Sequence, residues 1–393
     1  MSNPRTITRL AGLLATASLV AAACSTTTTG GSTAPSGASA PASAGSASGS
    51  AGASGGAMSM DDLVAAAKAE GSLTTIALPH DWCNYGAIIE GFKAKYGLTV
   101  TELNPDAGSG DEIEAVKANK DNPGPQAPDV IDVGITFGDP AKTEKLIQPY
   151  KVSTWDTIDP DLKDPDGYWY GDYYSILTFE VNKAAVPNVP QDWADLLLPE
   201  HKNQVALAGD PRASSQAINA VYAASLASGG SLDDAQPGLD FFKKLNDSGN
   251  FVPTIAKPGT IDTGATPITI RWAYNALSHK DAAAGNPEIE VVVPKAGRFL
   301  GVYAQAISAY APHPNAAKLW MEYLYSDEGQ AGWLTGYCHT TRLDDLKSRN
   351  MSADLIAKLP DIEGAVYPTS EQAAAAKELV TTKWDSVVGA DVK

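Results

Sequence analysis

The segment from His80 to Tyr85 (HDWCNY) holds side chains that suit recognition of an amine. Asp81 can pair with a cationic group, Trp82 can stack on one, and Asn84 can form hydrogen bonds. The chain has 8 Trp and 15 Tyr, and aromatic side chains most often serve packing. Each aromatic residue in such a segment is therefore a candidate contact as well as a candidate core residue.

Residues 209–216 (GDPRASSQ) lie between a strand pattern and a helix pattern. Ser214, Ser215 and Gln216 should then sit at a helix N-terminus, where free backbone N–H groups favour a carboxylate or phosphonate. The alternative is that Asp210 or Ser214 only caps the helix, which would stabilise it by ~1 kcal/mol and bind no ligand.

The elements that position these residues alternate between helix and strand. In the first part of the chain, helical spacing covers residues 61–71, 86–96 and 112–120, and strand patterns cover residues 72–78, 98–103 and 129–134. In the second part, helices are expected over residues 191–198, 213–228 and 238–247, with a strand over 204–208. This alternation predicts an α/β fold with a mostly parallel sheet and helices on both faces.

Two β-rich stretches, residues 168–182 and 288–310, flank the second block and have no helical period. They predict two Rossmann-like lobes joined by a two-segment hinge with a cleft between them. The expected divisions are residues 58–175 for lobe 1, 176–295 for lobe 2, and 296–393 for a return to lobe 1 with its C-terminal helices.

Cys24 stands between an export signal and a tether. Arg5 and Arg9 precede an apolar run over residues 10–23, which is short for a transmembrane helix and typical of a signal peptide. Residues 24–57 are rich in Ser, Thr, Gly, Ala and Pro, a flexible-linker composition. We expect an exported protein with a lipid anchor on Cys24; the alternative is an ordinary cleavage site after Ala23.

Composition and motifs narrow the function. The net charge of −17 disfavours nucleic acid and anionic lipid as partners. No HExxH, P-loop or dinucleotide fingerprint occurs, and the only GxSxG motif lies in the tether, at residues 52–56. An enzyme is therefore not expected.

Four further stretches carry a family resemblance: residues 70–73 (EGSL), 209–216, 267–275 (PITIRWAYN) and 311–330 (APHPNAAKLWMEYLYSDEGQ). With them the sequence resembles the solute-binding lipoproteins of ABC importers, in the hinged two-lobe cluster that takes up ferric ion, polyamines, thiamine or aminoethylphosphonate. The resemblance implies a monomeric type II periplasmic-binding-protein fold, a small-molecule solute and a membrane permease as partners, and no cofactor.

The resemblance also implies further ligand-binding residues. Lobe 2 would present Arg271, Trp272, Tyr274 and Asn275 to the cleft, and Tyr173 and Tyr174 would lie on the first crossing segment. An amine-containing solute is the expected ligand. Ferric ion is the alternative, although the tyrosine pair comes too early for the ferric-binding pattern. A surface protein that binds only a protein partner is the third hypothesis.

Cys83 and Cys338 remain in the mature domain, and the family fold would bring both close to the cleft. Because the exported compartment is oxidising, a disulfide is expected. The alternatives are two free thiols, or a zinc site completed by His80 and His339.

Overall fold

The computed structural model describes residues 58–122 and 124–393. The described residues form one compact unit. In the described part, none of the helices combines the length and the apolar character needed to cross a membrane. The predicted signal peptide, Cys24 and the tether of residues 24–57 lie outside the described residues and stay predictions.

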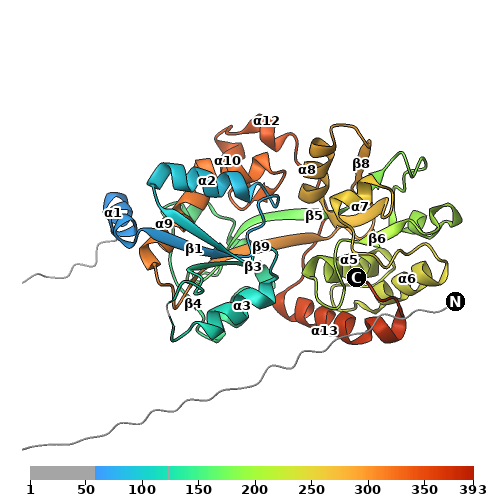
Figure 1. Cartoon of the computed structure of the whole chain (residues 1–393), viewed down its shortest axis with the longest axis horizontal. Helices are drawn as coiled ribbons and strands as arrows, with labels where there is room; N and C mark the ends of the chain where they lie inside the picture. Colours follow the sequence, from blue (N-terminus) through green and yellow to red (C-terminus); the bar gives the residue numbers. More distant parts are fainter. Residues whose placement is uncertain (1–57, 123) are drawn as a thin grey trace, which may run out of the picture. The chain divides into compact units, whose positions relative to one another are not determined.

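The first lobe is built on the parallel strands β1 (Ser72–Ile76) and β2 (Thr99–Leu103), with β3 (Val130–Gly134) beside β1 (Figure 1). Its helices include α1 (Met60–Glu70), α2 (Tyr85–Tyr96), α3 (Ser109–Ala118), α9 (Pro314–Leu324) and α10 (Asp327–Thr335). The helices and strands predicted for this region are confirmed.

The helix ends of the first lobe follow local sequence signals. The hydroxyl of Ser59 accepts a hydrogen bond from the backbone N–H of Asp62 and caps α1, which ends at Gly71 with a φ of 79°. Gly97 ends α2 in the same left-handed conformation, with a φ of 73°. Glycine adopts these angles without a steric penalty, so each helix stops where the next strand must begin.

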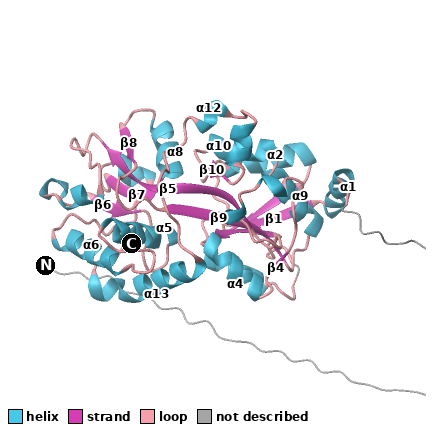
Figure 2. Cartoon of the chain, turned by 180° about the vertical axis from the view of Figure 1, so that it is seen from behind, coloured by secondary structure: helices cyan, strands magenta, loops and turns pink. Residues whose placement is uncertain are grey.

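The second lobe is built on β6 (Val205–Leu207), which runs parallel to β7 (Ile268–Trp272). Its helices are α5 (Ser215–Ala227), α6 (Gln236–Asp247), α7 (Pro258–Asp262) and α8 (Ala273–Ala283), and β8 (Ile289–Val292) pairs with β5. The segment predicted as a helix over residues 191–198 is a 3₁₀-helix, Trp193–Leu197. Figure 2 shows helices around the strands of both lobes.

Two long strands cross between the lobes, as predicted. They are β5 (Tyr170–Asn182) and β9 (Leu300–Ser308), and they run antiparallel to each other. The strand order β3-β9-β5-β7-β6 therefore continues from one lobe into the other. The expectation of a mostly parallel sheet is corrected: only the β1–β2 and β6–β7 pairs are parallel among the described strands, because β5 and β9 traverse the hinge in opposite directions.

A third segment, residues 361–369, also crosses the hinge. It runs beside β9, where Leu300 donates its N–H to the carbonyl of Val366 at 2.9 Å, and it leads to α13 (Ser370–Val387). Helix α13 contacts α5 and α6 of the second lobe and also Ile135–Phe137 of the first lobe. The division that assigns residues 296–393 to the first lobe stays a prediction.

The position of α13 has a clear physical cause in Trp384. This side chain is fully buried, and its ring centroid lies 5.6 Å from that of Phe242 and 6.1 Å from that of Phe251. Burying a large aromatic side chain is among the strongest local contributions to stability. The partners of Trp384 lie in the second lobe, so the helix packs there.

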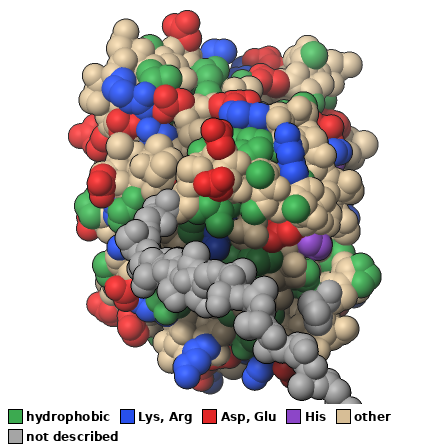
Figure 3. All heavy atoms as spheres, turned by 90° about the vertical axis from the view of Figure 1, so that its left-hand side faces the viewer, with side chains coloured by type: hydrophobic (Ala, Val, Ile, Leu, Met, Phe, Trp, Pro, Cys, Tyr) green, Lys and Arg blue, Asp and Glu red, His purple; other side chains and the backbone are tan. Residues whose placement is uncertain are grey.

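The remaining elements complete the first lobe and the hinge. They are α4 (Gly138–Thr143), β4 (Ile147–Gln148), β10 (His339–Thr340), α11 (Leu343–Ser348) and α12 (Ala353–Ile356). Strand β10 pairs with β5 at Tyr173 and Tyr174, which ties the end of α10 to the hinge. On the face that Figure 3 shows, acidic and basic side chains are interspersed.

Candidate ligand-binding site

A cavity of about 440 Å³ lies between the two lobes. The first lobe contributes the loop after β1, the start of α3 and Asp132 of β3, and the second lobe contributes the loop between β6 and α5. Tyr173 of β5 and Tyr303 of β9 complete it from the crossing strands. The cavity thus lies at the carboxyl ends of strands, where ligands of open α/β sheets bind.

The wall of the cavity is acidic. Asp106, Asp111, Glu112, Asp132 and Asp210 line it, and no Lys, Arg or His of the described residues does so. Glu112 and Asp132 are the buried members, with 1% and 4% of their surfaces exposed. Asp210, on the second-lobe side, is already paired with Arg212, whose Nε lies 2.9 Å from Oδ1.

Asp132 is only half satisfied by the protein. Its Oδ2 accepts hydrogen bonds from the hydroxyls of Tyr85 at 2.8 Å and Tyr173 at 3.1 Å. Its Oδ1 is buried and has no hydrogen-bond partner among the described residues. Buried polar atoms are nearly always paired, so this oxygen is a candidate acceptor for a group bound in the cavity.

Two further carboxyl groups surround Asp132. Glu112 accepts the backbone N–H of Asp132 at 2.8 Å, and Asp172 accepts the hydroxyl of Tyr85 at 3.2 Å. Gln305 donates to the Tyr85 oxygen at 2.7 Å, so the ring is held from both sides. These contacts fix the three acids relative to one another, and Glu112 and Asp132 line the cavity.

Burial dominates the electrostatics of this acidic cluster. It raises the pKa of Asp132 and of Glu112 well above their usual ranges, and the neighbouring carboxyls Asp172 and Asp132, respectively, add to these increases. Burial also raises the pKa of Asp172, to about 7. A cation inside the cavity would reverse this effect, because an opposite charge favours the ionised carboxylate.

Aromatic rings form the adjoining wall. Trp82 lies 5.9 Å from Tyr303 in an edge-to-face arrangement, and Tyr303 stacks on Tyr173 with centroids 5.1 Å apart. All three residues line the cavity. Aromatic faces beside carboxylates are a typical environment for an organic ammonium group.

The second-lobe wall is the N-terminus of α5. Ser214 accepts the backbone N–H of Ala217 at 3.4 Å and caps the helix, and Gln216 accepts the backbone N–H of Trp272 at 3.4 Å. Ser214, Ser215 and Gln216 all line the cavity. The capping interpretation therefore holds for Ser214, and the helix end still faces the cavity with the partial positive charge of its dipole.

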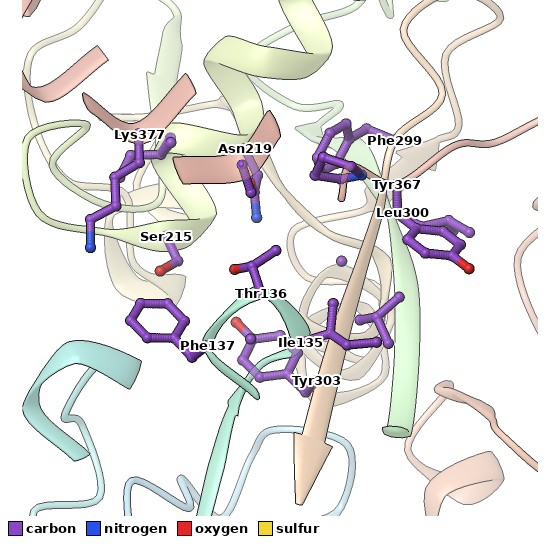
Figure 4. A pocket seen from close by; sticks show the side chains of 16 residues that line it. Ile135, Thr136, Phe137, Ser215, Asn219, Phe299, Leu300, Tyr303, Tyr367 and Lys377 are labelled. Atoms are coloured by element: carbon purple, nitrogen blue, oxygen red, sulfur yellow. The ribbon is translucent and has the colours of Figure 1, made fainter. Parts of the chain in front are cut away.

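A smaller pocket of about 70 Å³ continues from this wall along the boundary between the lobes. Figure 4 shows Thr136 and Phe137 of the first lobe opposite Ser215 and Asn219 of the second. It shares Ser215 and Tyr303 with the main cavity. A cavity of about 500 Å³ lined by residues of α3, α4 and α13 is larger still, so the buried acids, and not the volume, single out the cavity around Asp132 as the candidate site.

Comparisons with known proteins agree with this geometry. Residues 126–351 match the family of bacterial extracellular solute-binding proteins. An uncharacterised protein of Haemophilus influenzae is 30% identical over 263 residues, which cover 62% of this chain and 70% of the relative. The chain belongs to the bacterial extracellular solute-binding protein family.

Solved structures show that this solute-binding protein has the type II periplasmic-binding-protein fold. The structure of AfuA from Actinobacillus pleuropneumoniae with fructose-6-phosphate aligns with a TM-score of 0.61 at 22% identity, covering 81% of this chain and 98% of AfuA. AgtB from A. tumefaciens R10 with agropinic acid aligns with a TM-score of 0.63 at 16% identity, covering 81% and 99%. The predicted fold class and family resemblance are confirmed.

Five of the residues predicted from sequence line the cavity of this solute-binding protein: Trp82, Tyr173, Ser214, Ser215 and Gln216. The structure places other predicted residues outside its lining. Asp81 is exposed, Asn84 donates to the carbonyl of Gly332 at 3.2 Å, and Tyr174 stacks on His339 at 5.2 Å. Adjacent residues of a strand face opposite sides, which separates Tyr174 from Tyr173.

The four residues predicted on β7 and α8 lie outside the cavity lining. Arg271 pairs with Glu180 at 3.0 Å, and Trp272 is fully buried. Tyr274 contacts Trp82 and Tyr173, with ring centroids 5.6 and 6.0 Å away. Asn275 is buried and its Oδ1 has no partner among the described residues.

Cys83 and Cys338 are joined by a disulfide in the structure, with Cα atoms 5.6 Å apart. His80 instead lies 2.6 Å from Glu102, and His339 stacks on Tyr174. In residues 58–122 and 124–393, no group of three or more His, Cys, Asp or Glu side chains is placed to hold a metal ion.

Sequence reasoning missed Asp132, Glu112 and Tyr303. The available signal was an acid inside an apolar strand, at residues 129–134 (DVIDVG). Asp129, which directly precedes β3, shows why that signal is ambiguous: it accepts hydrogen bonds from the backbone N–H groups of Thr74 and His313, both at 2.7 Å. One acid of the predicted strand is satisfied by the fold, and the other keeps an unpaired oxygen.

Proposed function

We propose that this protein captures an amine-containing solute between its lobes and delivers it to a membrane permease of an ABC importer. The observation that carries the proposal is the unpaired, buried Oδ1 of Asp132 in a cavity lined by acids and by no basic side chain. An ammonium group there would provide the missing hydrogen bond and the missing positive charge.

The opposite wall favours a second polar group on the same solute. The N-terminus of α5 suits an anionic group, so an amino-phosphonate or an opine-like amino acid derivative would fit both walls. Polyamines and thiamine offer a positive charge only. Ferric ion fits less well, since no suitable ligand group of three lies within residues 58–122 and 124–393.

Binding would act by population shift and involve no covalent chemistry. A solute that touches Asp132 of the first lobe and Ser215 of the second makes both contacts only when the lobes are closed. It therefore stabilises the closed form, which the permease would recognise. We further propose that the protein is a monomer, tethered to the outer face of the cell membrane through lipidated Cys24.

Thermal unfolding of the soluble domain, beginning at Met58, tests the proposal. The panel contains polyamines, thiamine, amino-phosphonates, opine-like compounds, ferric citrate and short sugars. A ligand at ~100 times its dissociation constant should add ~2.7 kcal/mol of stability. A shift by amines alone supports the proposal. A shift by sugars or ferric citrate, or by no compound after unfolding and refolding to remove resident ligand, contradicts it.

A further inference from the structure

The residues that directly precede the disulfide-bonded Cys83 and Cys338 both contact the second lobe. Trp82, next to Cys83, has its ring centroid 5.6 Å from that of Tyr274. Tyr337, next to Cys338, donates its hydroxyl hydrogen to Oδ2 of Asp281. One covalent bond thus joins the two loops of the first lobe that carry these contacts.

Both contacts are made with the same helix of the second lobe. Tyr274 lies in the first turn of α8 and Asp281 in its last turn. They are seven residues apart, which is close to two helical turns, so they share one face of α8. The first lobe therefore contacts this face of α8 near both ends of the helix.

The two loops are built for this close approach. The residues Cys83, Asn84 and Tyr337 have positive φ angles of 45°, 67° and 64°. A Cβ atom on Gly336 would lie 2.4 Å from the backbone carbonyl carbon of Cys83, so only glycine fits there. Such conformations persist only where the surroundings enforce them, and here the disulfide and the Asn84–Gly332 hydrogen bond do so.

We propose that Trp82 and Tyr337, held together by the Cys83–Cys338 disulfide, form a clasp on α8 that sets the balance between the closed and open lobes. Trp82 also lines the cavity, so a bound solute and the clasp act on the same side chain. Tyr337 is a positioning residue that lies outside the cavity lining. The clasp goes beyond the proposed function, because it operates without any ligand.

Hydrogen exchange of the ligand-free protein, with small-angle scattering in parallel, tests the clasp. In Tyr337→Phe, amides of α8 should exchange about 3- to 10-fold faster and the radius of gyration should increase, because a charge-assisted hydrogen bond is lost. Tyr337→Lys should restore both values by pairing with Asp281. Amides of α6, which is distant from the clasp, serve as the internal reference.

Two further variants separate the clasp from simple packing. The double variant Cys83→Ser with Cys338→Ser should open the lobes more than Tyr337→Phe, since both contacts lose their support. Lys280→Gln, on the exposed side of α8, should change neither readout. Wild-type values for Tyr337→Phe, or failure of Tyr337→Lys to restore closure, would overturn the clasp. Because no solute is used, this outcome leaves the thermal-shift test of solute binding unaffected.

Discussion

Two buried carboxylates have opposite surroundings in the two lobes. Glu180 of the second lobe lies between two bases: Arg271 at 3.0 Å and His279, whose Nδ1 bonds to Oε1. Asp132 of the first lobe has hydroxyl donors on one oxygen, no partner on the other among the described residues, and Asp172 as a neighbour. Glu180 completes an internal ion pair, whereas Asp132 accepts hydroxyl hydrogen bonds only, and burial holds its pKa well above the usual range.

The largest effect on stability is expected when the ion pair between Glu180 and Arg271 is broken. In Glu180→Gln, Arg271 keeps its charge in a buried position without a carboxylate. We expect the free energy of unfolding to fall by about 3–5 kcal/mol, as for other buried pairs that lose one partner. Chemical denaturation at pH 7 measures this. Unchanged stability would show that Arg271 needs no counter-charge.

The same chemical change at Asp132 should affect binding and spare the fold. Asp132→Asn keeps an oxygen for Tyr85 and Tyr173 and removes the charge. We expect the affinity for an amine to fall by about 2–5 kcal/mol, which is roughly 30-fold or more. The unfolding free energy of the ligand-free protein should rise at pH 7. At this pH the Asp132 carboxyl opposes folding, because it is ionised in the unfolded chain whereas burial disfavours its ionised form in the folded chain. A loss of stability like that of Glu180→Gln would remove the distinction between the two sites.

Asp172 allows a pH test of the acidic cluster. Its pKa is raised to about 7, mainly by burial. A carboxyl whose pKa is higher in the folded chain than in the unfolded chain contributes its full stabilisation of the fold below about pH 4. This contribution is lost as the pH rises toward 7. The difference in unfolding free energy between wild type and Asp172→Asn should therefore change by about 3 kcal/mol over that interval. A constant difference would mean that Asp172 titrates normally.

Binding should follow the opposite pH trend. Raised pKa values keep protons on the empty cluster, and an ammonium group requires the carboxylates in their ionised form. We expect the affinity for an amine to increase as the pH rises from 5 to 8, with release of protons on binding. Calorimetry in two buffers of different ionisation enthalpy detects that release, and identical heats would argue against it.

The smallest expected effect separates helix capping from charge recognition. Ser214→Ala removes the N-cap of α5 and should cost about 1 kcal/mol of stability. The discrimination between an amine and a neutral analogue should remain that of wild type, because Ser214 lies on the wall opposite Asp132. Denaturation and calorimetry on the same sample check both statements.

Local sequence signals predicted most elements and part of the site. Helical spacing and glycine stops located α1 and α2, and strand-to-helix order located the α5 end of the cavity. The place of α13 was not predictable in this way, because it depends on which lobe holds the partners of Trp384. Asp132 was missed for a related reason: only tertiary structure shows that Asp129 is satisfied and Asp132 is not.

The most direct test of the ammonium site compares one amine with its N-acetylated form by calorimetry, on wild type and Asp132→Asn. The amine chosen is the one that gives the largest thermal shift. The account predicts that wild type binds the amine at least roughly tenfold tighter than the acetylated form, and that Asp132→Asn removes most of this preference. Equal binding of both forms by wild type, or an unchanged preference in Asp132→Asn, would contradict the assignment of Asp132 as the partner of a ligand cation.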